Sequence, residues 1–254
     1  MKYVKCIFFS FTLIFFSYFI AGQLLLPTDR LDQRNVCYEY TEEWYKVNPD
    51  GSESVIDVPG KFEKNIGKIK TIVPDNLDKR ITSICFRGQD LKAYLDDELI
   101  YEYSTANSRW FGITSPESYL TIPLSYNDAG KTLCIELVSD TGIIYQPYVG
   151  SELGIWVHIL RMYAGELLVA GITLIMGTLT VLISKVYGWI NGRRLDITYL
   201  GFGVILAAVW LVANSVFRQI LVSNVSVAAD LPFLTVMLIP FPFIIYMNVI
   251  QENR

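Results

Sequence analysis

The stretch Leu167–Ser184 reads LLVAGITLIMGTLTVLIS, eighteen residues without a charge. An α-helix rises about 1.5 Å per residue, so this stretch covers most of a hydrocarbon core about 30 Å thick. A buried helix of a large soluble protein is the alternative, but two more apolar runs follow, at Ile197–Ala213 and Leu231–Ile250. The sequence therefore predicts a helical membrane domain over residues 161–254, with spans at about 165–186, 196–216 and 230–250.

Basic residues indicate how these spans are oriented. Lys185, Arg193 and Arg194 follow directly after the first span. Cytoplasmic loops carry an excess of lysine and arginine, so this loop is predicted to lie in the cytoplasm. The predicted protein is a multi-pass protein of the cell membrane whose preceding domain is extracytoplasmic and whose C-terminus is cytoplasmic.

A fourth apolar run, Ile7–Ile20, begins the chain after Lys2 and Lys5. Fourteen residues are few for a span and are typical of a signal-peptide core. The small residues needed for cleavage are poorly represented, and Leu24–Leu26 extend the run. We therefore expect residues 1–26 to form an N-terminal signal anchor, with a cleaved signal peptide as the alternative.

The segment between Leu24 and Leu160 has a different composition. It contains 21 acidic and 13 basic residues, a net charge of −8. Nucleic acids and anionic lipid surfaces repel such a domain, so neither is expected to be its partner.

Apolar residues alternate along this segment with the period of half-buried strands. In Leu120–Leu124 and Leu133–Leu137 the leucine and isoleucine residues come at every second position, which places their side chains on one face. Asp96-Asp97 lies between two strand-like runs and predicts a hairpin turn, since aspartate tolerates positive φ better than most residues. Many short strands predict an all-β jelly roll or β-sandwich over residues 27–160, followed by α-helical transmembrane segments.

Several motifs in this order resemble the membrane sensor region of Gram-positive bacterial signalling proteins. In the first part they are Cys85-Phe86-Arg87, Lys92–Tyr101 (KAYLDDELIY), Ile122-Pro123-Leu124, Ala129-Gly130-Lys131 and Tyr148–Ser151. In the membrane part they are Gly201-Phe202-Gly203 through Trp210, Asn214-Ser215 and Met237–Phe243 (MLIPFPF).

The first set is similar to an extracytoplasmic galactose-binding-like jelly roll. The second is similar to the multi-helix sensor that precedes GGDEF (diguanylate cyclase) domains or, in some cases, helix-turn-helix output domains. The chain departs from the family by having Asp-Asp where the hairpin usually has Asp-Gly, and by lacking the GGDEF signature and a helix-turn-helix. The resemblance therefore implies a sensor without its output domain, and cyclase activity is not carried over.

The sequence contains none of the common catalytic motifs. It has no phosphate-binding glycine loop, metalloprotease motif or nucleophile elbow. The only histidine, His158, has no close cysteine or histidine with which to bind a metal. Acidic pairs such as Asp96 and Asp97 are expected on a solvated surface. The prediction is no enzyme, no cofactor, no catalytic residue and no metal site.

Two cysteines are candidates for a disulfide. By alternation, Cys85 and Cys134 both fall on the outer faces of their strands. They can pair if those strands are neighbours in an oxidising compartment. Free thiols are the alternative.

Aromatic side chains gather between Tyr101 and Tyr119. Aromatic rings on a loop of a β-sandwich stack on the apolar faces of sugars, and polar neighbours fix the orientation. Packing of the loop over the end of the sandwich is the plainer interpretation. The candidate ligand-binding residues are Tyr103, Arg109, Trp110 and Tyr119.

The favoured function is the sensory part of a membrane signalling protein. An unknown small molecule or carbohydrate would bind outside, and the helices would relay binding to a cytoplasmic signalling domain absent from this chain or within a homo-oligomer. A non-signalling adhesion or binding protein of the cell envelope is the alternative. The few spans argue against a transporter.

Overall fold

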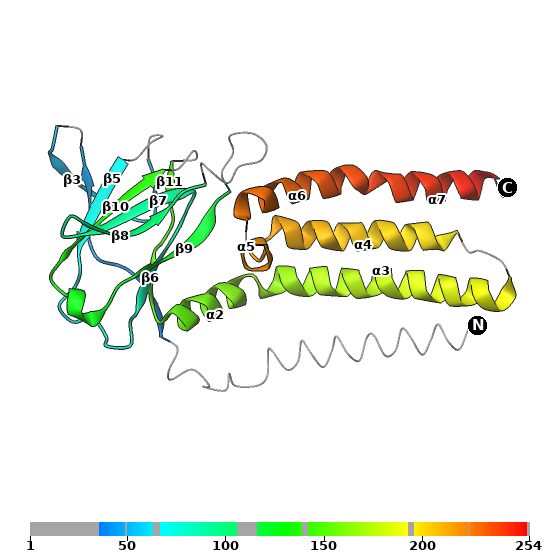
Figure 1. The fold of residues 1–254 in the computed structure, drawn as a ribbon, viewed down its shortest axis with the longest axis horizontal. Coiled ribbons are helices and arrows are strands. Elements are labelled where there is room, and N and C mark those ends of the chain that lie inside the picture. The colour runs from blue at the N-terminus through cyan, green and yellow to red at the C-terminus, as the bar shows by residue number, and fades with distance from the viewer. Residues whose placement is uncertain are drawn as a thin grey trace. The chain divides into compact units, whose positions relative to one another are not determined.

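The computed structural model describes residues 36–48, 50–62, 67–105, 116–138, 142–192, 196–222 and 224–252. Antiparallel β-sheets form the first part of this range and helices form the second (Figure 1). The predicted anchor at residues 1–26 lies outside the described residues.

Two antiparallel sheets form the β domain. Sheet A contains, in order, β1 (Cys37–Glu39), β12 (Tyr148–Gly150), β6 (Ser83–Gly88) and β9 (Ser118–Pro123). Sheet B contains β3 (Glu53–Ile56), β2 (Trp44–Val47), β5 (Gly67–Ile72), β10 (Thr132–Val138), β7 (Asp90–Leu95) and β8 (Glu98–Tyr103). A two-stranded sheet pairs β11 (Ile143–Ile144) with β4 (Gly60–Lys61), and a short 3-10 helix, η1 (Tyr126–Asp128), precedes β10.

Both sheets contribute to one apolar core. Ile84 and Phe86 from sheet A and Leu133 and Ile135 from sheet B are almost fully buried in the same cluster. The indole of Trp44 packs edge-on against Phe86, with ring centroids 5.5 Å apart. The alternation predicted for Leu120–Leu124 and Leu133–Leu137 is confirmed, because their leucine and isoleucine side chains all lie in this core.

The hairpin predicted at Asp96-Asp97 is also confirmed. It joins β7 to β8, and both aspartates have positive φ, 47° and 68°. The Asp96 carboxylate accepts a hydrogen bond from the Thr132 N–H at 2.9 Å. The Asp96 N–H also donates to the Thr132 carbonyl at 3.0 Å, so the aspartate side chain adds a second bond to β10, which glycine would lack.

Helices follow the last strand of sheet A. They are α2 (Glu152–Met162), α3 (Ala164–Asn191), α4 (Ile197–Asn214), α5 (Arg218–Leu221), α6 (Val225–Leu238) and α7 (Pro240–Glu252). In the described part of the chain, α3, α4 and the combined segment Val225–Gln251 are long and apolar enough to cross a membrane. The three predicted spans are thus confirmed as helices of spanning length and composition. Their outward side chains, such as Phe233 (71% exposed) and Met237 (70% exposed), form a surface suited to lipid.

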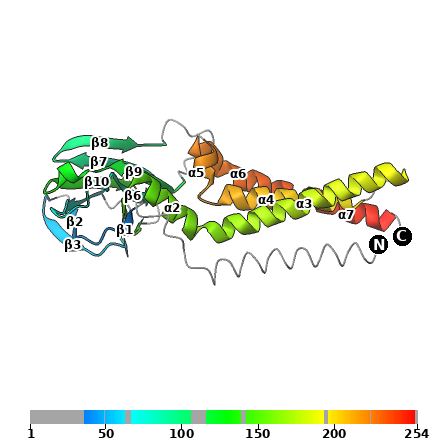
Figure 2. The same cartoon turned by 90° about the horizontal axis from the view of Figure 1, so that it is seen from below.

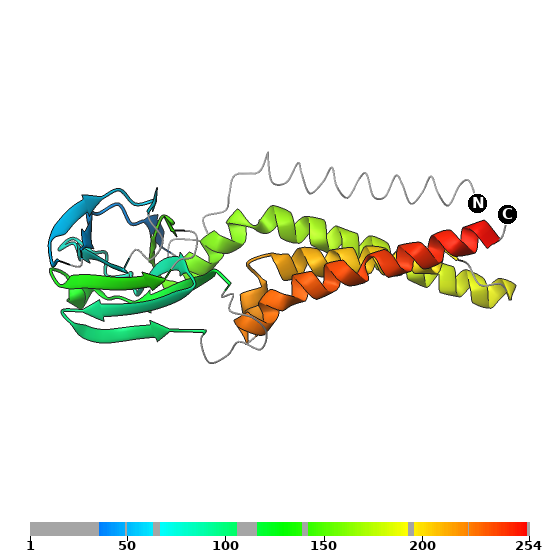
Figure 3. The same cartoon turned by 90° about the horizontal axis from the view of Figure 1, so that it is seen from above.

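The spanning helices pack side by side, with α4 against both α3 and the α6–α7 segment (Figures 1 and 2). In Figure 3 the orange α6 continues into the red α7, which begins at Pro240. A side chain at Gly177 or Gly201 would collide with the facing helix, because a Cβ there would lie 2.8 Å from Ile205 or 2.7 Å from Val181. Small residues let α3 and α4 approach closely, as in other membrane helix pairs.

The helical part begins earlier than the boundary predicted at residue 161. Ser151 caps α2, since its hydroxyl accepts the Gly154 N–H at 3.1 Å. Ile155 and Ile159, one turn apart, are fully buried against Cys85 and Tyr119 on the outer face of sheet A. Helix α2 therefore belongs to the β domain by its packing.

Candidate functional site

A cluster of polar and aromatic side chains lies where the outer face of sheet A meets the helices. Its members, named here the Arg87 site, are Arg87, Glu117, Tyr119, Tyr145 and Tyr163. Strands β6 and β9 supply Arg87 and Tyr119, which are direct cross-strand partners. Tyr163 joins α2 to α3, so the site contains groups from both the β domain and the foot of the first spanning helix.

Arg87 is the centre of this site. One Nη lies 3.0 Å from the Glu117 carboxylate, and the other donates to the Tyr163 hydroxyl at 3.4 Å. The guanidinium carbon lies 4.3 Å from the centroid of the Tyr145 ring and 5.9 Å from that of Tyr119, within the range of cation–π attraction. Burial alone would lower the pKa of Arg87, but the charge of Glu117 and the nearby tyrosines outweigh it and leave this pKa above its usual value. Arg87 is therefore a fixed positive charge.

The tyrosine hydroxyls link the remaining members. Tyr145 donates to Glu117 at 3.0 Å, and the hydroxyls of Tyr119 and Tyr163 lie 3.1 Å apart. Burial, reinforced by the contact with Tyr163, raises the pKa of Tyr119 well above its ordinary value. The Tyr119 hydroxyl therefore stays protonated near neutral pH and serves as a hydrogen-bonding group.

A second link joins sheet A to the helices through Gln219 in α5. Its side-chain carbonyl accepts the Tyr119 N–H at 3.0 Å, and its amide donates to the Tyr119 carbonyl at 3.3 Å. Strand β9 has no neighbouring strand on this side within sheet A, so Gln219 acts as a substitute strand partner for one residue. Movement of β9 is thereby coupled to the segment that connects α4 with α6.

Cavities lie on both sides of the Arg87–Tyr163 contact. The first, of about 520 Å³, is lined by Tyr119, Tyr145, Tyr148 and Lys61 together with Arg87 and Tyr163. The second, of about 540 Å³, reaches between the helices and is lined by Glu166, Trp210 and Asn214 together with the same two residues. Both volumes lie in the range of small-molecule sites, roughly 300–1,000 Å³. Hydroxyls, charges and aromatic faces converge there as a polar ligand with an apolar face requires.

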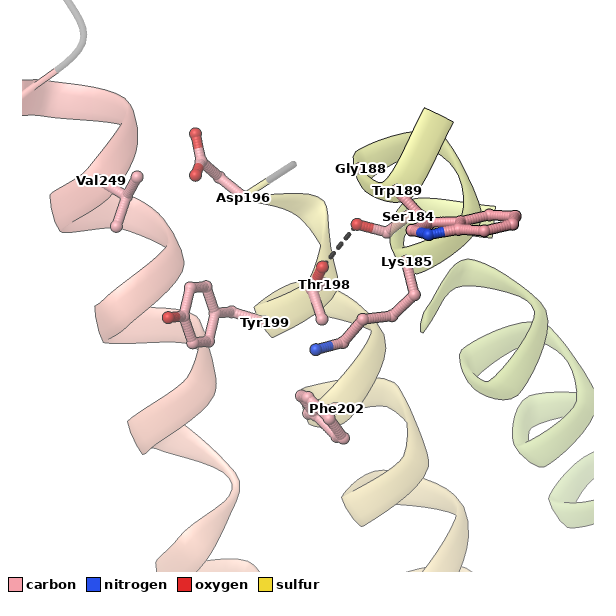
Figure 4. Close-up of a pocket in the computed structure, with 9 residues that line it drawn as sticks. All are labelled: Ser184, Lys185, Gly188, Trp189, Asp196, Thr198, Tyr199, Phe202 and Val249. Atoms are coloured by element: carbon pink, nitrogen blue, oxygen red, sulfur yellow. Dashed lines mark hydrogen bonds between the residues drawn. The ribbon is translucent and has the colours of Figure 1, made fainter. Parts of the chain in front are cut away.

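A third cavity lies at the far end of the helices (Figure 4). It measures about 490 Å³, and Lys185, Asp196, Thr198 and Tyr199 line it. The hydroxyls of Ser184 and Thr198 are hydrogen-bonded across α3 and α4, as the dashed line in Figure 4 marks. Trp189 at its rim is 87% exposed, as is usual for tryptophan at a membrane surface. This cavity touches no residue of the β domain.

The structure separates the predicted ligand-binding residues. Tyr119 lies in the Arg87 site on the outer face of sheet A. Tyr103 pairs with Leu91 in sheet B and packs against the apolar core, so the two rings face different sides. Arg109 and Trp110 lie outside the described residues.

Cys85 and Cys134, the candidates for a disulfide, are both free thiols, as the alternative had it. Their strands belong to different sheets, with Cys85 on the outer face of sheet A under α2 and Cys134 on the outer face of sheet B. The alternation was right about the faces, and the condition for pairing is not met because the strands are not neighbours. Burial raises the pKa of Cys85 to about 12 and that of Cys37 to about 11.

Among the described residues, no group of three or more histidine, cysteine, aspartate or glutamate side chains is placed to hold a metal ion. His158 instead packs on the Tyr148 ring, with centroids 4.7 Å apart.

The sequence analysis did not identify Arg87, Glu117, Tyr145, Tyr163 and Gln219 as site residues. One signal was available: Arg87 is the only charge in the strand Ser83–Gly88, and alternation places it beside Cys85, away from the core. Comparison of the chain with protein-family models, with curated protein sequences and with solved structures finds no match.

Proposed function

We propose that this chain is the sensory part of a membrane signalling protein. In this proposal the β domain is extracytoplasmic and has a galactose-binding-like jelly-roll fold. A small molecule or carbohydrate binds at the Arg87 site, and the helices relay binding to a cytoplasmic output domain. The protein is not an enzyme in this scheme.

One observation carries the proposal. Arg87 and Tyr163 line both junction cavities, so a ligand in either cavity touches the contact between sheet A and helix α3. A ligand shifts a conformational equilibrium only if it favours one arrangement over the other. Occupation of a cavity beside Arg87 changes the space and charge available to Tyr163, and so favours one position of α3 relative to β6.

The chemistry of the cavity supports a sugar or a similarly polar small molecule. Tyr119, Tyr145 and Tyr148 offer aromatic faces for the apolar side of a sugar ring. Lys61, Gln146 and Arg87 offer polar groups for its hydroxyls. Because Glu117 already balances the charge of Arg87, the site does not require an anionic ligand.

The strand connections support the proposed jelly roll. Consecutive strands cross between the sheets, from β5 in sheet B to β6 in sheet A, back to β7 and β8, then to β9 and again to β10. Such exchange between two antiparallel sheets is characteristic of double-sheet jelly rolls.

The first experiment measures ligand binding. The full chain in detergent is screened by thermal unfolding against monosaccharides, amino sugars, cell-wall disaccharides and amino acids. We expect at least one compound to raise the unfolding midpoint of the wild type but not of Arg87→Gln. Lys92→Gln removes an exposed lysine from sheet B and should respond as the wild type does. If no compound stabilises the wild type, or if Lys92→Gln loses the response equally, ligand binding at this site is rejected.

The second experiment measures transmission. A diguanylate cyclase domain is fused after Arg254, and its activity is recorded with and without the stabilising compound. We expect Gln219→Ala to bind the compound but to lose the change in cyclase activity. Gln219→Glu keeps the acceptor for the Tyr119 N–H and should retain part of the response. A response that Gln219→Ala leaves intact would show that the link through β9 carries no signal.

The proposed orientation is tested separately. Lys185, Arg193 and Arg194 follow α3 or lie near its end, which supports a cytoplasmic position for the α3–α4 connection. Green fluorescent protein fused after Arg254 should fluoresce, whereas alkaline phosphatase fused there should be inactive. The opposite pair of results would reverse the proposed topology.

A further inference from the structure

An apolar groove is bordered by α3, α4, α5 and α6 at the end of the helices next to the β domain. Its volume is about 540 Å³, and it is lined by Gly171 and Leu174 of α3, Val209 of α4 and Leu231 of α6, with Leu221 and Arg218 of α5. Leu174 is 45% exposed and Leu221 68% exposed. The groove therefore opens toward the hydrocarbon that surrounds the helices.

Two glycines on α3 differ in what lies beside them. At Gly177 a Cβ would lie 2.8 Å from Ile205 of α4, so the two helices are in close contact there. At Gly171 a Cβ would have no atom within 4 Å. Gly171 lies on a different face of α3 from Gly177, and no side chain of the described residues fills the space beside it.

Of the described residues that line the groove, Arg218 is the one with a charge. Among the described residues, no carboxylate or hydrogen-bond acceptor contacts its guanidinium. Burial, together with the positive charge of Arg87, lowers its pKa. A half-buried arginine beside a second arginine lacks the anion that normally compensates a buried charge.

The nearest acidic residue along α6, Asp230, does not fill this role. It forms no ion pair with Arg218, and one of its carboxylate oxygens is buried without a hydrogen-bond partner. The charge of Arg218 is therefore open to an anion from outside the chain.

These observations together point to one kind of occupant. We infer that the groove holds an anionic membrane lipid, with an alkyl chain between α3 and α4 and its phosphate on Arg218. The lipid comes from the leaflet next to the β domain. A water-soluble anion would leave the apolar groove empty, and a zwitterionic lipid would gain less from Arg218. Basic pockets between membrane helices are known sites for anionic headgroups. This inference is independent of ligand binding at the Arg87 site.

The test compares two lipids with identical chains. The full chain in mild detergent is titrated with phosphatidylglycerol or phosphatidylcholine, and bound lipid is counted by native mass spectrometry. We expect the wild type to bind the first phosphatidylglycerol at least about tenfold more tightly than phosphatidylcholine, since one charge-assisted contact in a partly buried site contributes about 1.4 kcal/mol or more. Equal affinity for the two lipids would overturn the inference.

Matched variants distinguish lipid binding in the groove from general electrostatic attraction between the protein and anionic lipid. Arg218→Gln should lose the preference, and Arg218→Lys should keep part of it. Arg161→Gln removes a charge on α2 that does not line the groove, so its preference should be unchanged. Loss of the preference in Arg161→Gln to the same extent would assign it to the overall field of the protein and refute the site.

Two glycine variants test the alkyl chain. Gly171→Leu fills the groove and should weaken binding of both lipids. Gly165→Leu enters equally open space on the same helix but lines the cavity at Arg87, so lipid binding should be retained. Circular dichroism confirms that each variant is folded. Inorganic phosphate alone should neither bind nor compete; competition by phosphate at equal concentration would show that the alkyl chain plays no part.

Discussion

Strand β6 has two faces that are both covered but by different materials. Ile84 and Phe86 point into the core between the sheets, where their neighbours are apolar and leave almost no exposed surface. Cys85 and Arg87 point outward, where α2 covers the thiol and a ring of tyrosines surrounds the guanidinium. The inner face is closed, whereas the outer face borders two cavities.

The two faces of β6 contribute differently: the inner face stabilises the β domain, and the outer face connects it to the helices. The inner face contributes free energy through burial of apolar surface, which needs no particular hydrogen-bond geometry. The outer face joins the β domain to the helices through a few directional contacts at Arg87, Tyr119 and Tyr163. Such contacts contribute little net stability and fix relative position, which fits the proposal that a ligand acts at this face.

The largest effect is expected on the inner face. Phe86→Ala removes a ring that is 1% exposed and packs against Trp44, so it should lower the free energy of unfolding by about 3–5 kcal/mol. Urea unfolding of the detergent-solubilised chain, followed by tryptophan fluorescence, measures the loss. Leu99→Ala truncates a side chain that is 48% exposed in β8 and should change stability by about 0.5 kcal/mol or less. Equal losses in the two variants would show that the core is not packed as described.

The second effect is on thiol reactivity and compares Cys85, which α2 covers on sheet A, with Cys134, which is partly buried on sheet B. Because burial raises the pKa of Cys85 to about 12, its thiolate fraction at pH 8 falls roughly a thousandfold below that of an ordinary thiol. Single-cysteine variants retaining Cys85 or Cys134 are treated with a disulfide reagent at pH 8, folded and in denaturant. Cys85 should be protected by about that factor in the folded chain, and Cys134, which is only partly buried, should be protected less. A Cys85 that reacts at the same rate in both states would contradict the cover by α2.

The same shift predicts how stability changes in base. The folded state holds the Cys85 proton more tightly than the unfolded state, so its contribution is fully present below about pH 9. It declines as the pH rises toward about 12, at no more than about 1.4 kcal/mol per pH unit. Cys85→Ala should reduce this decline, and an unchanged slope would argue against burial of the thiol.

A smaller effect is expected from the ion pair on the outer face. Glu117→Gln leaves the mostly buried Arg87 without its carboxylate and should cost about 1–2 kcal/mol. The matched variant, Glu102→Gln, breaks the exposed pair with Lys92 on sheet B and should cost about 0.5 kcal/mol or less. Adding Arg87→Met to Glu117→Gln should recover part of the loss. Thermal unfolding of the wild type and the three variants checks this, and a larger loss in Glu102→Gln would reverse the assignment.

The smallest effect on stability is expected in the turn between β7 and β8, which belongs to neither face of β6. Asp97 has a φ of 68°, which glycine adopts without strain, so Asp97→Gly should stabilise the hairpin by about 0.5 kcal/mol. Asp96→Gly should give no gain, because it removes the hydrogen bond to the Thr132 N–H. A gain of equal size in both variants would show that the Asp96 carboxylate contributes nothing.

Local patterns predicted those parts of the fold that depend on neighbours in sequence. The alternation around Ile122 and Ile135, the turn at Asp96-Asp97 and the three apolar helices all follow from periods of a few residues. The insertion of β12 between β1 and β6 joins segments more than a hundred residues apart, and no short pattern specifies it. Short patterns also do not specify whether the strands of Cys85 and Cys134 are neighbours, the condition on which the candidate disulfide depended.

The site shows the same division. Tyr119 was predicted, but its partners Tyr163 and Gln219 lie 44 and 100 residues further along the chain. Polar contacts between such distant segments depend on the packing of whole elements, which side-chain type alone does not determine. Helix α2 did carry a readable signal, since Ile155 and Ile159 are spaced by one helical turn.

The connection between β12 and α2 determines which side of α2 faces the sheet. Only Ser151 separates the last strand residue from the first helical one, and its N–H is bonded to the Val36 carbonyl while its hydroxyl caps the helix. A connection this short cannot absorb an inserted residue. Each residue of a helix advances the azimuth by about 100°, so a single alanine inserted after Ser151 would swing Ile155 and Ile159 off the sheet. The one-residue connection at Ser151 therefore determines how the helices that follow are rotated about their axes relative to the sheet.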